Sequence, residues 1–246
     1  MPIALLTDIH ANKEALAACL ADAEAWGAER YIFLGDYVGY GADPDYVVDL
    51  VEGYVARGAV ALRGNHDDAV AGSSARMNDT ARAAIQWTRG RLNERQRRFL
   101  AALPLTREEG GRLFVHANAV APQGWGYVTD RLEAARSLAA TRCSGVVCGH
   151  LHVPGVYHMA ANGVVGDFTP VDGVPIPLLP DRRWLVVLGA VGQPRDRNPA
   201  ACYALLDEDK EELTYVRVVY DVASAAEKIL EAGLPPSLAA RLLKGW

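Results

Sequence analysis

Short apolar runs that end in polar residues are the feature that most constrains what this chain can fold into. Such runs, about five residues long, alternate with segments whose apolar side chains recur at the helical period. They predict strands over residues 3–6, 31–34 and 59–62, and helices over residues 12–26 and 43–57. Asn12 suits the N-cap of the first helix, and Pro44 suits the first turn of the second. This alternation favours an α/β fold.

The rest of the chain begins with the same alternation and then changes. Helices are predicted over residues 80–100, with a break near Gly90, and over 130–140, and strands over 113–115 and 145–148. Further strands are predicted over 184–188, 202–206 and 213–219, followed by helices that begin near Val222 and Pro236. The turn-like residues 207–210 suggest that the last two strands form an antiparallel pair. No repeat or linker divides the sequence, so we expect a single domain over residues 1–246.

Composition and charge narrow the class of protein. Of the 246 residues, 50% are hydrophobic and 22% charged, which suits a globular chain that buries its core without disulfides. The four cysteines form no CxxC pair, and the N-terminal residues show neither a basic region nor a long apolar segment, so we expect a cytoplasmic protein without membrane association. The formal net charge of -5 argues against a general nucleic-acid binder. The oligomeric state is left open.

Residues with metal-ligating side chains follow five of the predicted strands. They are Asp8 with His10, Asp36, Asn65 with His66, His116, and His150 with His152. Taken singly, each also suits a helix cap, a core histidine or a turn, so the inference rests on the combination. Loops beyond the carboxyl ends of strands form the ligand crevice of open α/β sheets, and we therefore expect these residues to meet. Imidazole and carboxylate together favour Mn, Fe, Co, Ni or Zn over Mg or Ca.

The order of these blocks resembles that of the calcineurin-like metallophosphoesterases. The blocks of that family, DxH, GD, GNH(D/E), a lone His and GHxH, match residues 8–10, 35–36, 64–67, 116 and 149–152. The segments GDYVGYG at 35–41 and GAVGQPRDRNPAACYALLD at 189–207 are similar to the small bacterial branch of the family. This resemblance implies an α/β fold in the form of a four-layer α/β/β/α sandwich, with two mixed β-sheets flanked by helices.

The resemblance also implies a dinuclear centre that holds two divalent transition-metal ions, with manganese favoured. One ion would be bound by Asp8, His10, Asp36 and His152, and the other by Asp36, Asn65, His116 and His150. A metal-bridging hydroxide would attack a small phosphodiester, phosphomonoester or nucleotide. His66 would protonate the leaving oxygen or stabilise its charge, and Asp67 would either orient the His66 imidazole or serve as a cap or surface residue.

Residues outside these blocks bear on the choice of substrate. Arg195 and Arg63 are candidate phosphate-binding residues, because guanidinium pairs bidentately with phosphate, although Arg195 could equally stabilise its own loop. The serine/threonine phosphatases of the superfamily carry an arginine where this chain has Tyr40, which argues against protein phosphatase activity. The segment 188–191 and the loop after His116 also depart from the bacterial branch, so its substrate specificity does not transfer to this chain.

Two alternative functions remain at this point. A nuclease could use the basic residues between 89 and 98 to hold a phosphate backbone, and could stack a base on Trp125 or Tyr127. Glu94 and the lack of interleaved aromatic residues instead favour a solvated helix face. A catalytically silent binding scaffold would typically lack the GNH histidine or some of the ligands, whereas this chain retains all of them. We therefore predict a metal-dependent phosphoesterase.

Overall fold

The computed structural model describes residues 1–72 and 77–246. Its strands are β1 (Ile3–Leu6), β2 (Arg30–Phe33), β3 (Val60–Ala61), β4 (Thr106–Glu109), β5 (Arg112–Val115), β6 (Gly145–Cys148), β7 (Gly155–Met159), β8 (Val165–Phe168), β9 (Ile176–Pro177), β10 (Arg183–Val187), β11 (Ala201–Asp207) and β12 (Glu212–Val218). Its helices are α1 (Lys13–Ala25), α2 (Pro44–Ala56), α3 (Asn65–Ala71), α4 (Asp79–Arg91), α5 (Glu94–Ala102), α6 (Arg131–Ala139), α7 (Val222–Glu231) and α8 (Pro236–Lys244), with a 3-10 turn at Pro122–Gly124. Within this described part, no helix combines the length and the apolar character needed to cross a membrane.

Two mixed sheets form the centre of the molecule. The first has the strand order β3-β2-β1-β11-β12-β9, and the second has the order β4-β5-β6-β10-β7-β8. In the first sheet β1 runs parallel to β2 and antiparallel to β11, and in the second β10 runs parallel to β6 and antiparallel to β7. The predicted antiparallel pair β11–β12 is confirmed. The parallel strands place their carboxyl ends, and the loops that follow them, at one edge of each sheet.

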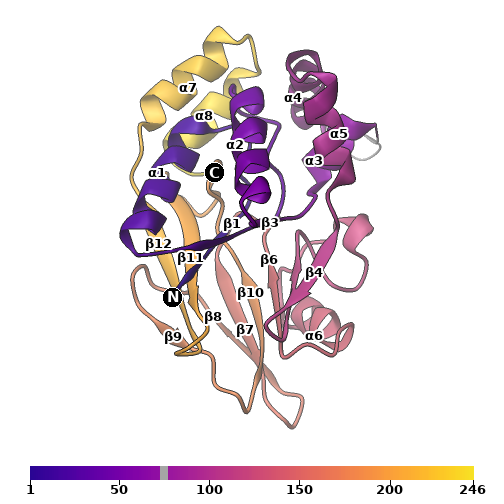
Figure 1. The fold of residues 1–246 in the computed structure, drawn as a ribbon, viewed down its shortest axis with the longest axis vertical. Helices are drawn as coiled ribbons and strands as arrows, with labels where there is room; N and C mark the ends of the chain where they lie inside the picture. The colour runs from indigo at the N-terminus through magenta and orange to yellow at the C-terminus, as the bar shows by residue number, and fades with distance from the viewer. Residues whose placement is uncertain (73–76) are drawn as a thin grey trace.

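Side chains of β1 alternate between two apolar layers, as the two-residue period of a strand requires. Ile3 and Leu5 belong to the cluster between the two sheets, whereas Ala4 and Leu6 belong to the cluster that packs α1 and α2 on the first sheet. Leu138 of α6 belongs to a further cluster on the outer face of the second sheet. Figure 1 shows α6 beside the second sheet, away from α1 and α2. The predicted four-layer sandwich is therefore confirmed, while the single domain over 1–246 stays a prediction.

The structure departs from the predicted elements in two respects. The break predicted near Gly90 falls instead at Leu92 and Asn93, and Gly90 itself is helical. The reason is a capping box, in which Asn93 and Gln96 each accept the backbone N–H of the other at 3.0 Å, so that α5 begins there. Helix α3 and strands β4, β7, β8 and β9 were not predicted. β4, for example, has the polar sequence TREE and is defined by its pairing with β5 rather than by any apolar pattern.

Candidate metal centre

The polar residues predicted to meet do lie together, in the loops that follow β1, β2, β3, β5 and β6. Their ligand atoms form three overlapping groups, each within 4.8 Å: Asp8 with His10 and His152, His10 with Asp36 and His66, and Asp36 with His116 and His150. All of these residues are buried, and the partly exposed Asn65 joins them through its side-chain oxygen. We call Asp8, His10, Asp36 and His152 the first ligand group, and Asp36, Asn65, His116 and His150 the second ligand group.

The backbone of the ligand loops is unusual and firmly held. Five of the residues have a left-handed conformation with φ between 47° and 66°, namely Asp8, His10, Asp36, His150 and His152. Hydrogen bonds between loops fix this geometry: Asp8 N–H donates to Gly35 O at 3.0 Å, and His10 N–H donates to Asp36 O at 2.9 Å. Residues other than glycine adopt this region only where the surrounding structure imposes it. The fold therefore dictates where these side chains point.

Each histidine of the two ligand groups directs one ring nitrogen to a backbone carbonyl. The pairs are His10 Nδ1 with Val38 O at 3.1 Å, His116 Nδ1 with Leu34 O at 2.9 Å, His150 Nε2 with Trp125 O at 3.0 Å, and His152 Nδ1 with Gln193 O at 2.6 Å. A carbonyl can only accept a hydrogen bond, so each of these nitrogens carries the hydrogen. The other nitrogen of each neutral ring then presents a lone pair to the site. This arrangement is typical of metal-ligating histidines.

In the first ligand group, these lone pairs face one another and a carboxylate. His152 Nε2 lies 3.1 Å from His10 Nε2 and 3.1 Å from Asp8 Oδ1. Asp8 Oδ2 accepts hydrogen bonds from Thr7 and from the backbone of His150, but Asp8 Oδ1 is buried with no partner among the described residues. Such a convergence of acceptors calls for a cation. Atoms that share one ion at about 2.1 Å lie about 3.0 to 3.4 Å apart, so the residues present fit a metal.

The second ligand group shows the same convergence. His116 Nε2 lies 3.2 Å from His150 Nδ1, 3.2 Å from Asn65 Oδ1 and 3.4 Å from Asp36 Oδ2. Asp36 Oδ2 also lies 3.6 Å from His10 Nε2, which belongs to the first group. One carboxylate oxygen therefore faces both groups, and Asp36 is placed to join them.

Burial and charge set the protonation of the ligand groups. Burial lowers the pKa of His10 well below its ordinary value and that of His150 to about 3, so both rings are neutral, the form that binds metal. Burial alone would also lower the pKa of His116, but the carboxylate of Asp36 raises it to about 9. Burial opposes ionisation of Asp36 and Asp8 as well, yet the neighbouring histidines hold the pKa of both carboxyls below the ordinary range. Without a metal, a proton on His116 supplies the positive charge for which the second group calls.

His66 lies beside these groups but is held differently. Its backbone N–H donates to Asp36 Oδ1 at 2.8 Å, and its ring lies edge-on to that of His10, with centroids 4.8 Å apart. Its Nδ1 is buried and has no hydrogen-bond partner in the described part of the chain. Burial lowers the pKa of His66 to about 4. His66 thus lacks the carbonyl contact that orients the four histidines of the ligand groups, in keeping with the separate role predicted for it.

The structure places Asp67 in a capping role. Its Oδ2 accepts the backbone N–H groups of Asp36 at 2.8 Å and Gly64 at 2.9 Å, and its Oδ1 accepts that of Tyr37 at 3.0 Å. Burial and the carboxylate of Asp36 raise the pKa of Asp67 to about 8, against the effect of these bonds. Among the described residues, the hydrogen bonds of this carboxylate go to backbone N–H groups and not to the His66 ring. Asp67 therefore holds the backbone of the Asp36 loop and does not orient the His66 imidazole.

The structure brings Arg195 to the site but not Arg63. Arg195 lines a pocket of about 410 Å³ together with residues of both ligand groups, His66, Tyr40, Tyr127, Met77, Asn78 and Ala81. Arg63 does not line this pocket: it donates to Ala101 O at 3.0 Å, and its Nε lies 3.7 Å from Asp68. Arg195 therefore lies at the site, whereas Arg63 lies between α3 and α5, and phosphate binding by either arginine stays a prediction.

Three further residues lie at the site, although the sequence predicted neither metal nor phosphate binding for them. Tyr40 lies between His10 and His66, with ring centroids 4.6 and 4.5 Å away. The ring of Tyr127 stacks on that of His150, with centroids 4.2 Å apart, and Tyr127 is 48% exposed. Gln193 accepts from His152 through its backbone and from Arg195 through its side chain. Tyr40 and Gln193 stand in the GDYVGYG and VGQPR segments, so those segments could have indicated them.

The basic residues between 89 and 98 are largely engaged with neighbouring groups. Arg95 pairs with Asp49 at 2.6 Å and with Glu52, and Arg98 lies 3.7 Å from Glu94 one helical turn away. Arg91 lies over the ring of Trp87 on its own helix. Because their charges are balanced locally or solvated, these arginines do not favour the nuclease alternative.

Comparisons with known proteins agree with this geometry. The family model described as the calcineurin-like phosphoesterase superfamily domain matches residues 1–211. An uncharacterized protein of Methanocaldococcus jannaschii is 35% identical over 250 residues, covering 99% of this chain and 98% of that protein. The crystal structure of a metallophosphoesterase from Sphaerobacter thermophilus is 34% identical and has a TM-score of 0.88, with 100% of this chain and 99% of that chain covered. A hypothetical protein from Pyrococcus horikoshii, 20% identical, shares the fold with a TM-score of 0.81, over 100% of this chain and 98% of that chain.

Proposed function

Because this chain belongs to the calcineurin-like phosphoesterase superfamily, we propose that it is a metal-dependent phosphoesterase that hydrolyses a small phosphodiester, phosphomonoester or nucleotide. One observation carries the proposal. Lone pairs and carboxylate oxygens converge at 3.1 to 3.4 Å in two groups that share Asp36, at the ends of the strands. A site of this kind is suited to cations and to the anionic substrates that cations attract.

We assign two divalent transition-metal ions to the two ligand groups, with manganese favoured among Mn, Fe, Co, Ni and Zn. The donor set of imidazole nitrogens and carboxylate and amide oxygens supports such ions. Asp36 would be shared, since its Oδ2 faces both groups and its negative charge offsets the repulsion between two cations. When bound, the ions would supply Lewis acidity toward phosphoryl oxygens and a water acidic enough to attack phosphorus near neutral pH.

The chain itself supplies binding and proton chemistry. Arg195 would hold a non-bridging phosphoryl oxygen, because its guanidinium lines the pocket and donates there to the neutral Gln193 side chain. His66 would donate its N–H to the leaving oxygen or transfer the proton to it. Asp67 would keep the Asp36 loop in place through its three backbone contacts.

The test is hydrolysis of bis-p-nitrophenyl phosphate and of p-nitrophenyl phosphate by protein stripped with EDTA, before and after Mn(II) is restored. Turnover that depends on the metal and is lost in His66→Ala would support the proposal, and the ratio of the two rates would say which ester class to screen. Protein that binds its metals but hydrolyses neither ester with any of the five metals would instead favour a binding scaffold or an enzyme with a very narrow substrate range.

The proposed setting is the cytoplasm. Cys19, Cys143, Cys148 and Cys202 are all free thiols, and all but Cys143 are buried. Free thiols fit a reducing compartment such as the cytoplasm. Colocalisation of a tagged chain with a cytoplasmic marker, against a membrane marker, tests this setting.

A further inference from the structure

We infer that the C-terminal helical pair, α7 and α8, positions the two substrate-facing side chains Tyr40 and Arg195. This inference rests on the proposed phosphoesterase function. The matched family domain ends at residue 211, before either helix begins, so nothing in that match assigns the pair a role. The pair nevertheless contacts the site from two directions.

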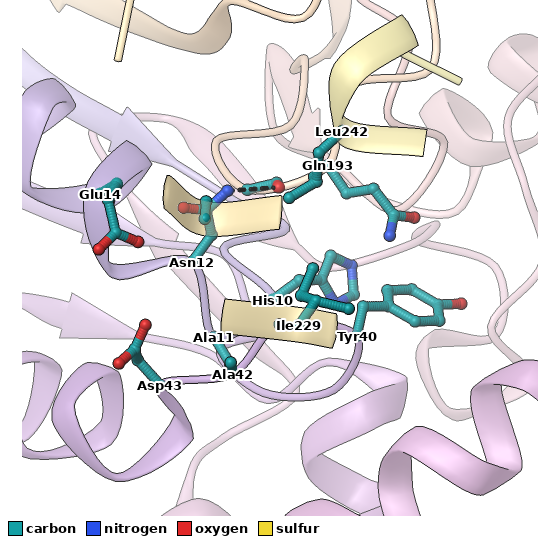
Figure 2. A pocket seen from close by; sticks show the side chains of 13 residues that line it. His10, Ala11, Asn12, Glu14, Tyr40, Ala42, Asp43, Gln193, Ile229 and Leu242 are labelled. Atoms are coloured by element: carbon teal, nitrogen blue, oxygen red, sulfur yellow. Dashed lines mark hydrogen bonds between the residues drawn. The ribbon is translucent and has the colours of Figure 1, made fainter. Parts of the chain in front are cut away.

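The first contact is with Tyr40. One side of its ring faces His10 and His66, and the residue is only 7% exposed. Tyr40 also belongs to an apolar cluster that contains Ile229 of α7 and Leu242 of α8. Figure 2 shows Ile229 in front of His10 and Tyr40, and Leu242 next to Gln193, around a small pocket that the helices close. The two helices therefore support the loop that carries Tyr40 from behind.

The second contact is with the loop that carries Arg195. Gly245, which directly follows α8, accepts the backbone N–H of Arg197 at 2.7 Å. Gly245 has a φ of 67°, and a Cβ there would lie 2.6 Å from the carbonyl carbon of Asn198. The end of α8 is therefore in close contact with the backbone two and three residues after Arg195. Any shift of α8 would be passed to that loop.

Polar contacts fasten the pair to the metal loops. Lys228 of α7 bonds to Glu14, in the first turn of α1, and, at 3.1 Å, to Asp43, the N-cap residue of α2. Asn12 donates to the hydroxyl of Tyr220, just before α7, at 3.1 Å. The pair is thus fixed beside the ends of two loops, the one that carries His10 and the one that carries Tyr40, rather than lying loosely on the surface.

Arg195 needs such support because its own anchoring is weak. Its guanidinium donates to Gln193 Oε1 at 2.9 Å and lies 5.8 Å from the Tyr40 ring centroid, and both partners are neutral. A charge held by neutral groups keeps its attraction for a phosphoryl oxygen, but its position depends on the packing around those groups. Displacement by about 1 Å can cost on the order of 100-fold in rate.

The first experiment compares leucine variants within the manganese-loaded protein. Leu242→Ala is expected to weaken binding of inorganic phosphate, measured by calorimetry, by about 10-fold or more, and to lower kcat/KM by a similar factor, with manganese stoichiometry unchanged. Leu243→Ala, on the exposed side of the same helix, and Leu138→Ala, buried in the separate cluster on α6, are expected to leave phosphate binding unchanged. Leu242→Met keeps the volume and is expected to restore near-native binding.

The second experiment is a double-mutant cycle. Gly245→Ala is expected to lower phosphate affinity about 10-fold in the native background and to have no further effect in Arg195→Ala, because both changes act through the same guanidinium. Additive effects, or native phosphate binding in both Leu242→Ala and Gly245→Ala, would overturn the inference. Phosphate binding is measured without turnover. A wild-type protein that binds phosphate but hydrolyses no ester would therefore count against the proposed function, while the comparison of phosphate affinities would still test the inference.

Discussion

The Nε2 atoms of His10 and His152 face each other at 3.1 Å, although each ring directs its hydrogen to a backbone carbonyl. A shared cation explains this contact, so removal of one ring should remove one ion. We expect His152→Ala to lower the manganese content from two ions per chain to one, measured by elemental analysis after gel filtration. His158→Ala, a histidine on β7 outside both ligand groups, is the matched control and should keep both ions. Full stoichiometry with unchanged affinity in His152→Ala would show that the first ligand group is wrongly assigned.

Metal removal should destabilise the protein. The converging acceptors of the first ligand group repel one another when no cation lies between them, and in the second group a metal ion would replace the proton on His116. We expect manganese at 100 times its dissociation constant to add about 2.7 kcal/mol per site to the free energy of unfolding. Thermal unfolding of EDTA-treated protein, with and without Mn(II), measures the effect. An unchanged melting temperature across a manganese titration would contradict the proposed centre.

His66→Ala should separate catalysis from metal binding. His66 has no carbonyl-fixed ring nitrogen, so we expect its removal to leave both ions in place and to lower kcat by about 10²- to 10⁴-fold, the usual contribution of a proton donor. Steady-state kinetics and elemental analysis on the same preparation give both quantities. Loss of an ion together with activity would instead make His66 a ligand, as its place near His10 and Asp36 would allow.

Gly39 leaves the space that the His66 ring occupies, because it has no Cβ. A Cβ at Gly39, whose φ is 81°, would collide with Nδ1 of His66, whereas a Cβ at Gly27, whose φ is 78°, would meet nothing within 4 Å. Both alanine variants carry similar backbone strain, so we expect similar losses of stability. Only Gly39→Ala should also lower kcat, by displacing the imidazole, while both ions are retained. Equal kcat values in the two variants would argue that the position of His66 does not matter for turnover.

Asp67→Ala should destabilise the fold more than its position near the site suggests. It would leave the buried backbone N–H groups of Asp36, Gly64 and Tyr37 without their acceptor. Each unsatisfied group costs about 1 to 3 kcal/mol, so a loss of at least about 2 kcal/mol is expected in urea unfolding. Asp68→Ala, at the next position of α3 and with only a distant arginine partner, should cost less than about 1 kcal/mol.

The alternation of strands and helices and the gathering of the ligand residues could be predicted from the sequence for a physical reason, whereas the four-layer sandwich was implied only by the family resemblance. Apolar strands that end in Asp8, Asp36 or His116 determine both the sheet and the place where the polar side chains emerge. Side-chain direction beyond the loops could not be obtained in this way. Arg63 stands beside the GNHD block in sequence, yet it turns to Ala101 because α5 packs there. Asp67, equally close, turns to backbone N–H groups that only the folded Asp36 loop presents.

Contacts between distant parts of the chain were also beyond the sequence. Tyr40 packs in one cluster with residues of α7 and α8, about 190 to 200 positions later in the chain. No local sequence pattern predicts that packing. The polar strand β4 was not predicted because its side chains are largely exposed and give no apolar pattern. Only its pairing with β5 makes it a strand. The local sequence pattern thus predicted which residues form the candidate metal site. Tertiary packing determines which other side chains lie beside them.

The left-handed backbone at five ligand positions has an evolutionary consequence. Glycine at Asp8, His10, Asp36, His150 or His152 would relieve roughly 1 kcal/mol of strain at each position. At Asp8 and Asp36 this gain is opposed, because their carboxylates accept the buried backbone N–H groups of His150 and His66, but no such N–H among the described residues depends on the three histidine rings. In a descendant that no longer needed its ions, mutations to glycine would be the easiest to fix. Glycine at the three histidine positions would then mark a lineage that had lost the proposed metal centre.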